Sequence, residues 1–262
     1  MNKWKKILLR VFTITFWTGA GIGFMVLCAS ALTEQKNIKV RQVKVSIDSG
    51  KDIFFVNSDD VFEIINHNYP SGLVGMRLDT LNLKDLEKDV SRNPFIQTAE
   101  LYTTIRGDVT VKVEQREPIA RVINNNRVSF YIDRNGVKMP ASTKFTPRVP
   151  VFCGDIKINS EPGRNTADSI LFNSMYSLAL YIDGNSFWKA QVQQVNVTEK
   201  GEFEIIPMLG NQTILLGNAN ELDEKFRRAM IYYKEVLKNV DASKYSTVNV
   251  KYKNQIICTK YN

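Results

Sequence analysis

The distribution of apolar and charged residues divides the chain into a short basic tail, one long uncharged segment and a larger mixed remainder. Residues 11–32 form a run of 22 residues without a formal charge. As a helix this run would extend about 33 Å, enough to cross a hydrocarbon core about 30 Å thick. The pattern predicts a transmembrane helix over residues 11–32, preceded by a cytoplasmic tail over residues 1–10.

The charges around this segment give its predicted orientation. Four basic residues and no acid precede it, which favours a cytoplasmic N-terminus and a main body outside the cytoplasm: Lys3, Lys5, Lys6 and Arg10. Basic residues also follow the segment, so the asymmetry is incomplete: Lys36, Lys39, Arg41 and Lys44. The alternative is a cleaved signal peptide, because Ala29-Ser30-Ala31 resembles an A-x-A cleavage site.

After a short polar linker, the pattern predicts a small domain over residues 38–120. Residues 40–47 partly alternate and are rich in β-branched side chains, as in a strand. Two helices follow. The first is capped by Asn57 or Ser58, and the acidic pair Asp59-Asp60 fits its first turn better than it fits catalysis. The second is indicated by apolar spacing from Leu83 to Val90 and should stop near Asn93-Pro94. Residues 95–105 and 109–113 predict two strands. The expected order is strand, helix, helix, strand, strand.

Residues 121–262 predict a second, β-rich domain with flanking helices, so the expected fold class is α+β. We expect Pro118 to end the preceding strand. Leu171, Met175 and Leu178 have helical spacing within residues 169–182, a segment too short to span a membrane. A second amphipathic helix is predicted over residues 221–238. The predicted strands are residues 128–132, 147–154, 192–197, 203–205 and 213–216.

The last predicted strand has an apolar face and a cationic face. Val248, Val250 and Tyr252 alternate with polar or basic residues, and successive side chains of a strand point to opposite sides. The alternating residues are Asn249, Lys251 and Lys253.

Composition excludes some functions. The formal net charge is +8, of which the N-terminal tail supplies four charges, and the remaining Lys and Arg residues are scattered among acids. This arrangement is typical of a solvated surface rather than of a nucleic-acid site. Cys28, Cys153 and Cys258 form no CxxC pair, and a bridge between Cys153 and Cys258 stays open because sequence does not give their separation.

The chain shows no pattern of a catalytic centre. It has one histidine, His67, and lacks the GxSxG, GxxxxGK[ST] and HExxH motifs. Paired carboxylates for sugar chemistry remain open, since their separation is spatial. We therefore expect no enzymatic activity, no cofactor and no metal ion.

Two stretches resemble a known family. Residues 93–101 (NPFIQTAEL) and residues 109–120 (VTVKVEQREPIA) are similar to the end of a POTRA domain in FtsQ/DivIB cell-division proteins. Pro150-Val151-Phe152 and the run Glu224-Lys225-Phe226 after Gly217 resemble further parts of that family. Lys225 is expected either to pack in the domain or to contact a partner.

The resemblance implies that the C-terminal strand is a sheet edge to which a partner adds a strand. Tyr252 matches the family's tyrosine after a basic residue, whereas a later family aromatic is not reproduced at its place, with Tyr261 nearby. The candidate partner-binding residues are Val250, Lys251, Tyr252, Asn254, Gln255, Ile256 and Ile257.

The resemblance further implies a single-pass protein of the bacterial inner membrane at the division septum. Its body would lie in the periplasm, bind FtsB- and FtsL-like bitopic proteins and help to control septal cell-wall synthesis. The POTRA domain and the transmembrane helix, which contains Gly19 and Gly23 in a GxxxG spacing, are further candidate contact sites for division proteins. The rival hypotheses are another membrane-anchored POTRA-type assembly or transport factor and a periplasmic enzyme released after Ala31.

Overall fold

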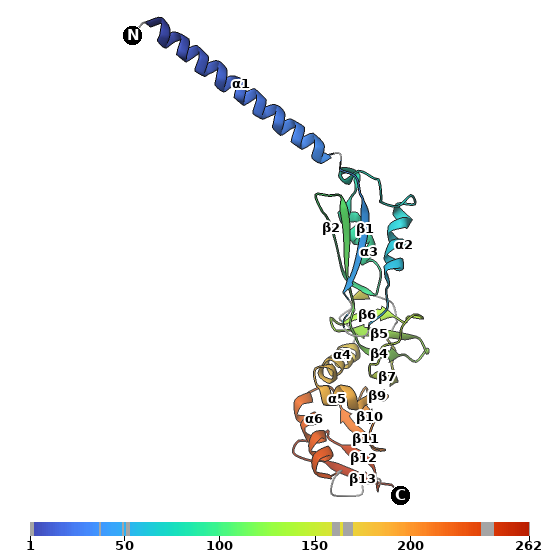
Figure 1. Ribbon diagram of the computed structural model, residues 1–262. Helices are drawn as coiled ribbons and strands as arrows, with labels where there is room; N and C mark the ends of the chain where they lie inside the picture. The colour runs from blue at the N-terminus through green and yellow to red at the C-terminus, as the bar shows by residue number, and fades with distance from the viewer. Residues whose placement is uncertain are drawn as a thin grey trace. The chain divides into compact units, whose positions relative to one another are not determined.

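The structure, a computed structural model, forms two compact units (Figure 1). Each unit is assembled from three separate stretches of the chain. Unit 1 contains Met1–Ile47, Ser58–Arg92 and Thr98–Val113. Unit 2 contains Asp48–Asn57, Asn93–Gln97 and Glu114–Asn262. The boundary predicted at residue 120 stays a prediction. The structure describes residues 3–36, 38–48, 50, 53–158, 163–164, 170–236 and 244–261.

The chain begins with a long helix, α1 (Lys3–Lys36), which contains the predicted membrane segment. Its described apolar side chains are exposed, among them Phe12 and Trp17. The Thr15 hydroxyl donates to the Phe12 carbonyl at 3.0 Å, and the Thr18 hydroxyl donates to the Thr15 carbonyl at 3.0 Å. Both hydroxyls are thus satisfied by the helix backbone.

Among the described residues, no helix is both long enough and apolar enough to span a bilayer. The predicted membrane span stays a prediction. The orientation and cleavage predictions concern side chains outside the described set: Lys3, Lys5, Lys6, Arg10 and residues 29–31.

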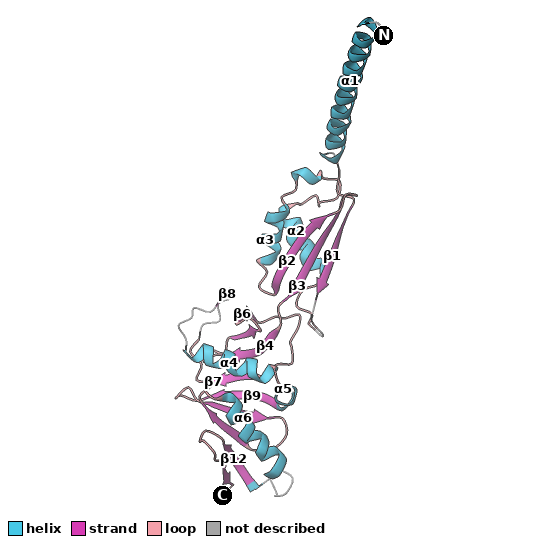
Figure 2. Ribbon diagram, turned by 90° about the vertical axis from the view of Figure 1, so that its left-hand side faces the viewer, coloured by secondary structure: helices cyan, strands magenta, loops and turns pink. Residues whose placement is uncertain are grey.

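Unit 1 carries a three-stranded sheet in the order β1-β3-β2, with α2 and α3 on one side of it (Figure 2). The predicted order of strand, helix, helix, strand, strand is confirmed, with a short 3-10 turn, η1, added before α3. The bounds are β1 (Gln42–Asp48), α2 (Ser58–Asn68), η1 (Leu78–Thr80), α3 (Leu83–Ser91), β2 (Ile96–Thr103) and β3 (Asp108–Gln115).

Local sequence explains these elements. Val109, Val111 and Val113 of β3 are fully buried, as strand alternation predicts. The Asn82 side chain caps α3 by accepting the Asp85 N–H at 3.3 Å. The helix ends before Pro94 because the residue before a proline disfavours helical geometry.

Unit 2 is built on a ten-stranded sheet in the order β13-β12-β11-β10-β9-β7-β4-β5-β6-β8. Helices α4, α5 and α6 cover one face of it (Figure 2). The strands are β4 (Pro118–Ile123), β5 (Ser129–Asp133), β6 (Val137–Pro140), β7 (Val151–Gly154), β8 (Gly163–Arg164), β9 (Val192–Val197), β10 (Phe203–Pro207), β11 (Thr213–Gly217), β12 (Tyr245–Asn249) and β13 (Ile257–Lys260).

The helices of unit 2 bury the residues that the apolar spacing selected. Met175 and Leu178 of α4 are fully buried, and Leu171 packs against the same core. Phe226 and Ala229 of α6 are buried in it as well. The predicted limits at Ser169 and Lys238 lie outside the described residues. The bounds are α4 (Ile170–Asp183), α5 (Ser186–Gln191), α6 (Leu222–Ile231) and a π-helix, η2 (Tyr232–Val236).

Pro118 corrects one prediction, because it begins a strand rather than ending one. Strand β3 already stops at Gln115, and β4 runs from Pro118 between β5 and β7 in the middle of the sheet. Proline is tolerated as the first residue of a strand, where its missing N–H leaves the ladder intact. Strands β6 and β8 and helix α5 were also missed, and each is short.

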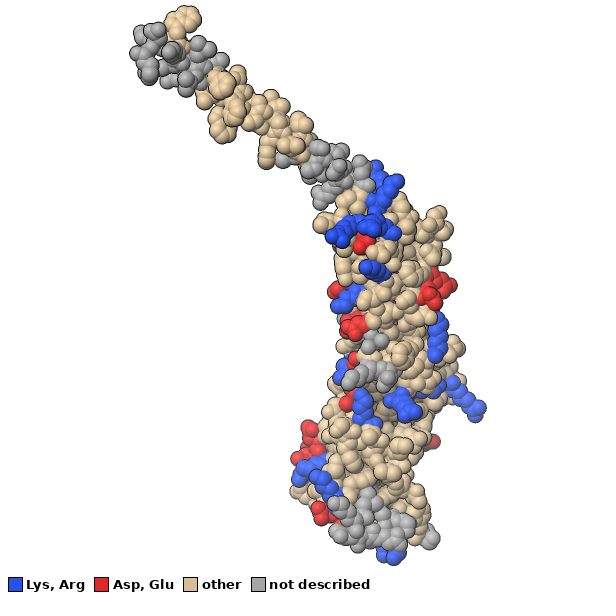
Figure 3. All heavy atoms as spheres, in the orientation of Figure 1, with Lys and Arg blue, Asp and Glu red and all other residues tan. Residues whose placement is uncertain are grey.

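Basic and acidic side chains are interspersed on the surface drawn in Figure 3. This agrees with the scattered charge pattern of the sequence.

The fold class is α+β, as predicted.

Candidate partner-binding edge

The C-terminal strand β13 forms one end of the unit 2 sheet. Strand β12 pairs in parallel with β11 and antiparallel with β13. No further described strand follows β13. An edge of this kind presents unpaired backbone N–H and C=O groups, on which another chain can pair.

The hydrogen bonds show which backbone groups of β13 are directed outward. Tyr261 N–H donates to the Lys244 carbonyl at 3.0 Å, so it is directed inward. In an antiparallel strand, alternate residues direct their N–H and C=O groups to the same side. The backbone groups of Thr259 and Ile257 are therefore directed to β12. The backbone groups of Cys258 and the N–H of Lys260 are directed to the open edge, whereas the Lys260 carbonyl accepts the Ser246 hydroxyl at 3.5 Å.

The segment before β13 corrects the prediction of one continuous strand over residues 248–253. Strand β12 ends at Asn249, and the chain turns back into β13. The Asn249 side-chain oxygen accepts the Lys251 N–H at 3.0 Å, and Asn254 adopts φ +58°. Such Asx turns and left-handed residues are typical of a reversal in chain direction. Tyr252 consequently lies in the turn.

The buried Arg228 side chain stabilises the start of the turn. Val250 is fully buried, and its N–H donates to the Leu215 carbonyl at 3.1 Å. Its own carbonyl accepts two hydrogen bonds from the Arg228 guanidinium, at 3.1 Å from Nε and 2.9 Å from Nη2. Arg228 is 4% exposed. Hydrogen bonds to a charged group are stronger than neutral ones, so α6 fixes the start of the turn.

The predicted cationic face is neutralised within unit 2. Lys251 Nζ lies 2.7 Å from Glu202 Oε2, and Lys253 Nζ lies 3.0 Å from Glu221 Oε1. The Lys251 stem crosses Gly217, whose φ is +75° and where an added Cβ would lie 2.9 Å from Lys251 Cδ. The glycine that helped to suggest the family is thus required by a close approach.

Lys225 is an internal packing residue. Its Nζ donates to the Asn218 carbonyl at 2.8 Å and to the Asn218 side-chain oxygen at 2.7 Å. The residue is 5% exposed, and burial, followed by the nearby Arg228 charge, lowers the pKa of its ammonium group. Its hydrogen bonds to Asn218 support the loop after β11.

The predicted partner residues divide into an inner and an outer set. Val250 is buried, and Lys251 and Ile256 are half-buried. Tyr252 is 54% exposed and Ile257 is 45% exposed. Asn254 and Gln255 are exposed as well.

Sequence reasoning named Tyr261 but missed two apolar residues, Met208 and Leu209, in the loop that Tyr261 contacts. Tyr261 is 53% exposed, and its hydroxyl donates to the Asn211 carbonyl at 3.2 Å. Asn211 lies in the loop between β10 and β11 that also carries Met208 and Leu209, which are 68% and 70% exposed. The sequence contained a signal for these exposed residues, because two large apolar residues directly before Gly210 in a turn have no core to enter.

The described residues contain no cluster of His, Cys, Asp or Glu that could hold a metal ion. Cys153 and Cys258 both carry free thiols, and burial raises the pKa of each.

Comparisons with known proteins agree with this architecture. A family model described as "FtsQ/DivIB, C-terminal related" matches residues 117–259, more than half of the chain. A model described as "POTRA-like domain" matches residues 39–114. The Cell division protein FtsQ of Rhodothermus marinus is 23% identical over 172 residues, which cover 64% of this chain and 62% of that protein. The match thus spans less than two thirds of that relative. The chain belongs to the FtsQ/DivIB family.

Proposed function

We propose that the chain is a non-enzymatic, single-pass scaffold of the bacterial division apparatus. It binds FtsB- and FtsL-like bitopic proteins and helps to control septal cell-wall synthesis. Membership of the family and the name of the Rhodothermus relative support a role in division. The POTRA-like domain and α1 provide further contact sites for other division proteins.

The proposal includes an anchor in the inner membrane, with the N-terminus in the cytoplasm and the body in the periplasm at the septum. The helix α1 and its uncharged residues 11–32 support this anchor. Its described apolar side chains, Phe12 and Trp17 among them, are exposed and have no core to enter. Two threonine hydroxyls bond to the helix backbone, which lowers the cost of placing them in lipid.

The observation that carries the partner proposal is the free outer side of β13. Its outward backbone groups, which are the N–H and C=O of Cys258 and the N–H of Lys260, match the requirements of β-augmentation, in which an added strand gains backbone hydrogen bonds. The exposed Tyr252 and Ile257 lie before and at the start of this edge and provide side-chain selectivity. Affinity thus comes from the backbone, and the choice of partner comes from the turn.

A proline at Lys260 tests the edge directly. Lys260→Pro removes an outward N–H, and proline is tolerated on an edge strand whose N–H faces solvent. Lys260→Ala removes the charge and keeps the N–H, so it is the matched control. The tagged full chain would be isolated from its own cells in mild detergent, and the FtsB- and FtsL-like proteins that accompany it would be quantified.

We expect Lys260→Pro to reduce the bound bitopic proteins at least tenfold, and Lys260→Ala to reduce them less than twofold. Equal recovery with both variants at an unchanged melting temperature would exclude β13 as the partner edge. Loss with both variants would assign the interaction to the charge instead of the backbone.

A further inference from the structure

Three segments of unit 1 meet close to the point where the chain leaves the predicted membrane segment. We call them the entry surface: residues 38–41, 74–77 and 104–107. Val40 N–H donates to the Met76 carbonyl at 2.8 Å. Arg41 N–H donates to the Gly107 carbonyl at 2.9 Å. The segments therefore form one surface, at the end of the sheet where β1 begins and β2 turns into β3 (Figure 2).

The entry surface exposes apolar side chains at two tips. Ile105, in the turn between β2 and β3, is 86% exposed, and Val74, in the loop before η1, is 62% exposed. The turn is held in place, because Gly107 has φ +87° and a Cβ there would collide with the Lys39 carbonyl oxygen. Aliphatic side chains exposed in this way match those that interfacial proteins place among lipid headgroups and acyl chains.

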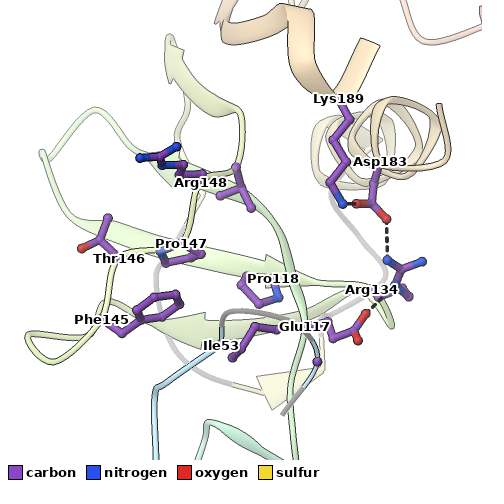
Figure 4. Close-up of a pocket in the computed structure, with 12 residues that line it drawn as sticks. Ile53, Glu117, Pro118, Arg134, Phe145, Thr146, Pro147, Arg148, Asp183 and Lys189 are labelled. Carbon is purple, nitrogen blue, oxygen red and sulfur yellow. Dashed lines mark hydrogen bonds and ion pairs between the residues drawn. The ribbon is translucent and has the colours of Figure 1, made fainter. Parts of the chain in front are cut away.

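The entry surface is also basic. Its three segments contain four basic residues and no acid: Lys39, Arg41, Arg77 and Arg106. The flanking acids are Asp79, which pairs with Arg77, and Asp108. The other three basic residues are exposed and form no ion pair with a described residue. Lys and Arg gather at this end of unit 1 in Figure 3, whereas around a pocket of unit 2 in Figure 4 Arg134 pairs with Glu117.

The proposed anchor holds this surface near the bilayer. From Leu32, the last residue of the uncharged segment, the chain advances seven residues to Lys39. An extended chain covers at most about 3.6 Å per residue, so Lys39 lies no more than about 25 Å from the hydrocarbon edge. The limit falls to about 17 Å when the chain is helical to Lys36, as it is in α1. The headgroup layer takes up about 5–8 Å of this distance.

We propose that the entry surface binds the anionic phospholipid headgroups of the membrane that holds α1. Lys39, Arg41 and Arg106 attract the headgroups, and the two apolar tips enter the interfacial layer. The anchor keeps these lipids at a high local concentration, so a weak attraction at each side chain is enough. The inference rests on the proposed anchor and goes beyond it, because it fixes unit 1 against the lipid. It also gives a role to the basic residues that follow the membrane segment.

The test measures how close single sites of the full chain come to lipid in nanodiscs. A nitrobenzoxadiazole label is attached at Ile105→Cys, and its fluorescence is quenched by doxyl-labelled lipid that contacts it. One set of discs contains phosphatidylcholine alone, and the other adds phosphatidylglycerol to about a third of the lipid. The native cysteines are first replaced: Cys28→Ser, Cys153→Ser and Cys258→Ser.

Two further label sites separate the inference from the anchor. Ile170→Cys, at the start of α4 in unit 2, is the matched control, because Ile170 is also 86% exposed. Gly21→Cys lies in the middle of the uncharged segment and reports the anchor itself.

Charge is tested on the same labelled chain. The test variant removes the three cations of the entry surface: Lys39→Gln, Arg41→Gln and Arg106→Gln. The control variant removes three exposed cations elsewhere in unit 1: Lys88→Gln, Arg92→Gln and Lys112→Gln.

We expect the label at Ile105→Cys to be quenched at least about fivefold more than the label at Ile170→Cys in discs with phosphatidylglycerol. Its quenching should fall about threefold in discs without this lipid, in about 0.5 M salt, and with the test variant, because each change weakens the attraction between charges. The control variant should keep the quenching unchanged.

The inference alone is overturned if Gly21→Cys is quenched while Ile105→Cys is quenched no more than Ile170→Cys. That result would assign the basic side chains to an acidic protein partner. Equal quenching at Ile105→Cys in both lipid mixtures, or with both charge variants, also overturns it. A label at Gly21→Cys without quenching would remove the proposed anchor and, with it, the inference.

Discussion

Units 1 and 2 bury different kinds of side chain. The buried residues of unit 1 are apolar, with Val61, Leu86 and Val111 at its centre. All of the buried polar or charged residues among the described ones belong to unit 2: Gln115, Asn124, Asp133, Lys138, Gln191, Gln212, Lys225 and Arg228.

The difference shows how each unit is specified. In unit 1 the apolar periodicity of helices and strands is enough to define what is buried. In unit 2 single polar side chains hold segments that are distant in sequence. Gln115 accepts the N–H groups of Phe55 and Val56, both at 2.9 Å, and the Asn124 amide donates to the Ile158 carbonyl at 3.1 Å.

The largest loss of stability is expected from Arg116→Ala in unit 2. Arg116 Nη1 lies 2.8 Å from Asp133 Oδ2, and the Asp133 side chain is 1% exposed. Removing the arginine leaves a buried charge uncompensated, which costs about 3–5 kcal/mol. Arg92→Ala in unit 1 is the control, because Arg92 is 78% exposed in its pair with Asp89 and its loss costs about 0–1 kcal/mol. Urea unfolding measures the loss in free energy of unfolding for each variant. Equal losses would contradict the claim that buried charged residues stabilise unit 2 more than exposed ion pairs stabilise unit 1.

Leu86→Ala tests the apolar basis of unit 1. The Leu86 side chain of α3 is 1% exposed, so its truncation leaves a cavity and should lower the free energy of unfolding by about 3 kcal/mol. Leu86→Met conserves volume and should cost less than about 1.5 kcal/mol. Similar losses for the two variants would mean that shape, and not apolar volume, limits this core.

Gln115→Ala should cost less, about 2 kcal/mol, because it leaves the N–H groups of Phe55 and Val56 without an acceptor. Amide hydrogen exchange at these two residues should become faster, while exchange at Val111 of unit 1 stays unchanged. Gln255→Ala removes an exposed glutamine and serves as the control. Unchanged exchange at Phe55 would show that another group holds this segment.

Much of unit 1 could be predicted because its elements are encoded locally. The alternation of Val109, Val111 and Val113 and the cap at Asn82 lie within the elements that they define. The segment around Phe55 was different. Phe55 stacks on Phe95 with ring centroids 4.9 Å apart and meets Tyr131 at 5.9 Å, a set that unites distant parts of the chain. Periodicity does not reveal such pairs.

The sequence located the candidate edge near the C-terminus but did not predict the turn that divides it into two strands, β12 and β13. Alternation continues through Val250 and Tyr252, yet the strand ends because Asn249 caps a turn and Arg228 binds the Val250 carbonyl from 22 residues away. A pocket of about 610 Å³ in unit 2 could not be predicted, since its lining runs from Gly50 to Lys189.

Tyr252→Ala should have the smallest effect on stability and separates binding from folding within unit 2. Tyr252 is 54% exposed in the turn, so its truncation should change the free energy of unfolding by less than about 0.5 kcal/mol. If the ring anchors the partner, the same variant should lose about 2 kcal/mol of binding free energy, or about 30-fold in affinity. Tyr102→Ala, which truncates a 50% exposed tyrosine in unit 1, is the matched control and should leave affinity for FtsB- and FtsL-like proteins unchanged. Melting temperature and partner affinity need to be measured on the same samples, because a lowered melting temperature with retained affinity would assign Tyr252 to folding and leave the edge without its proposed anchor.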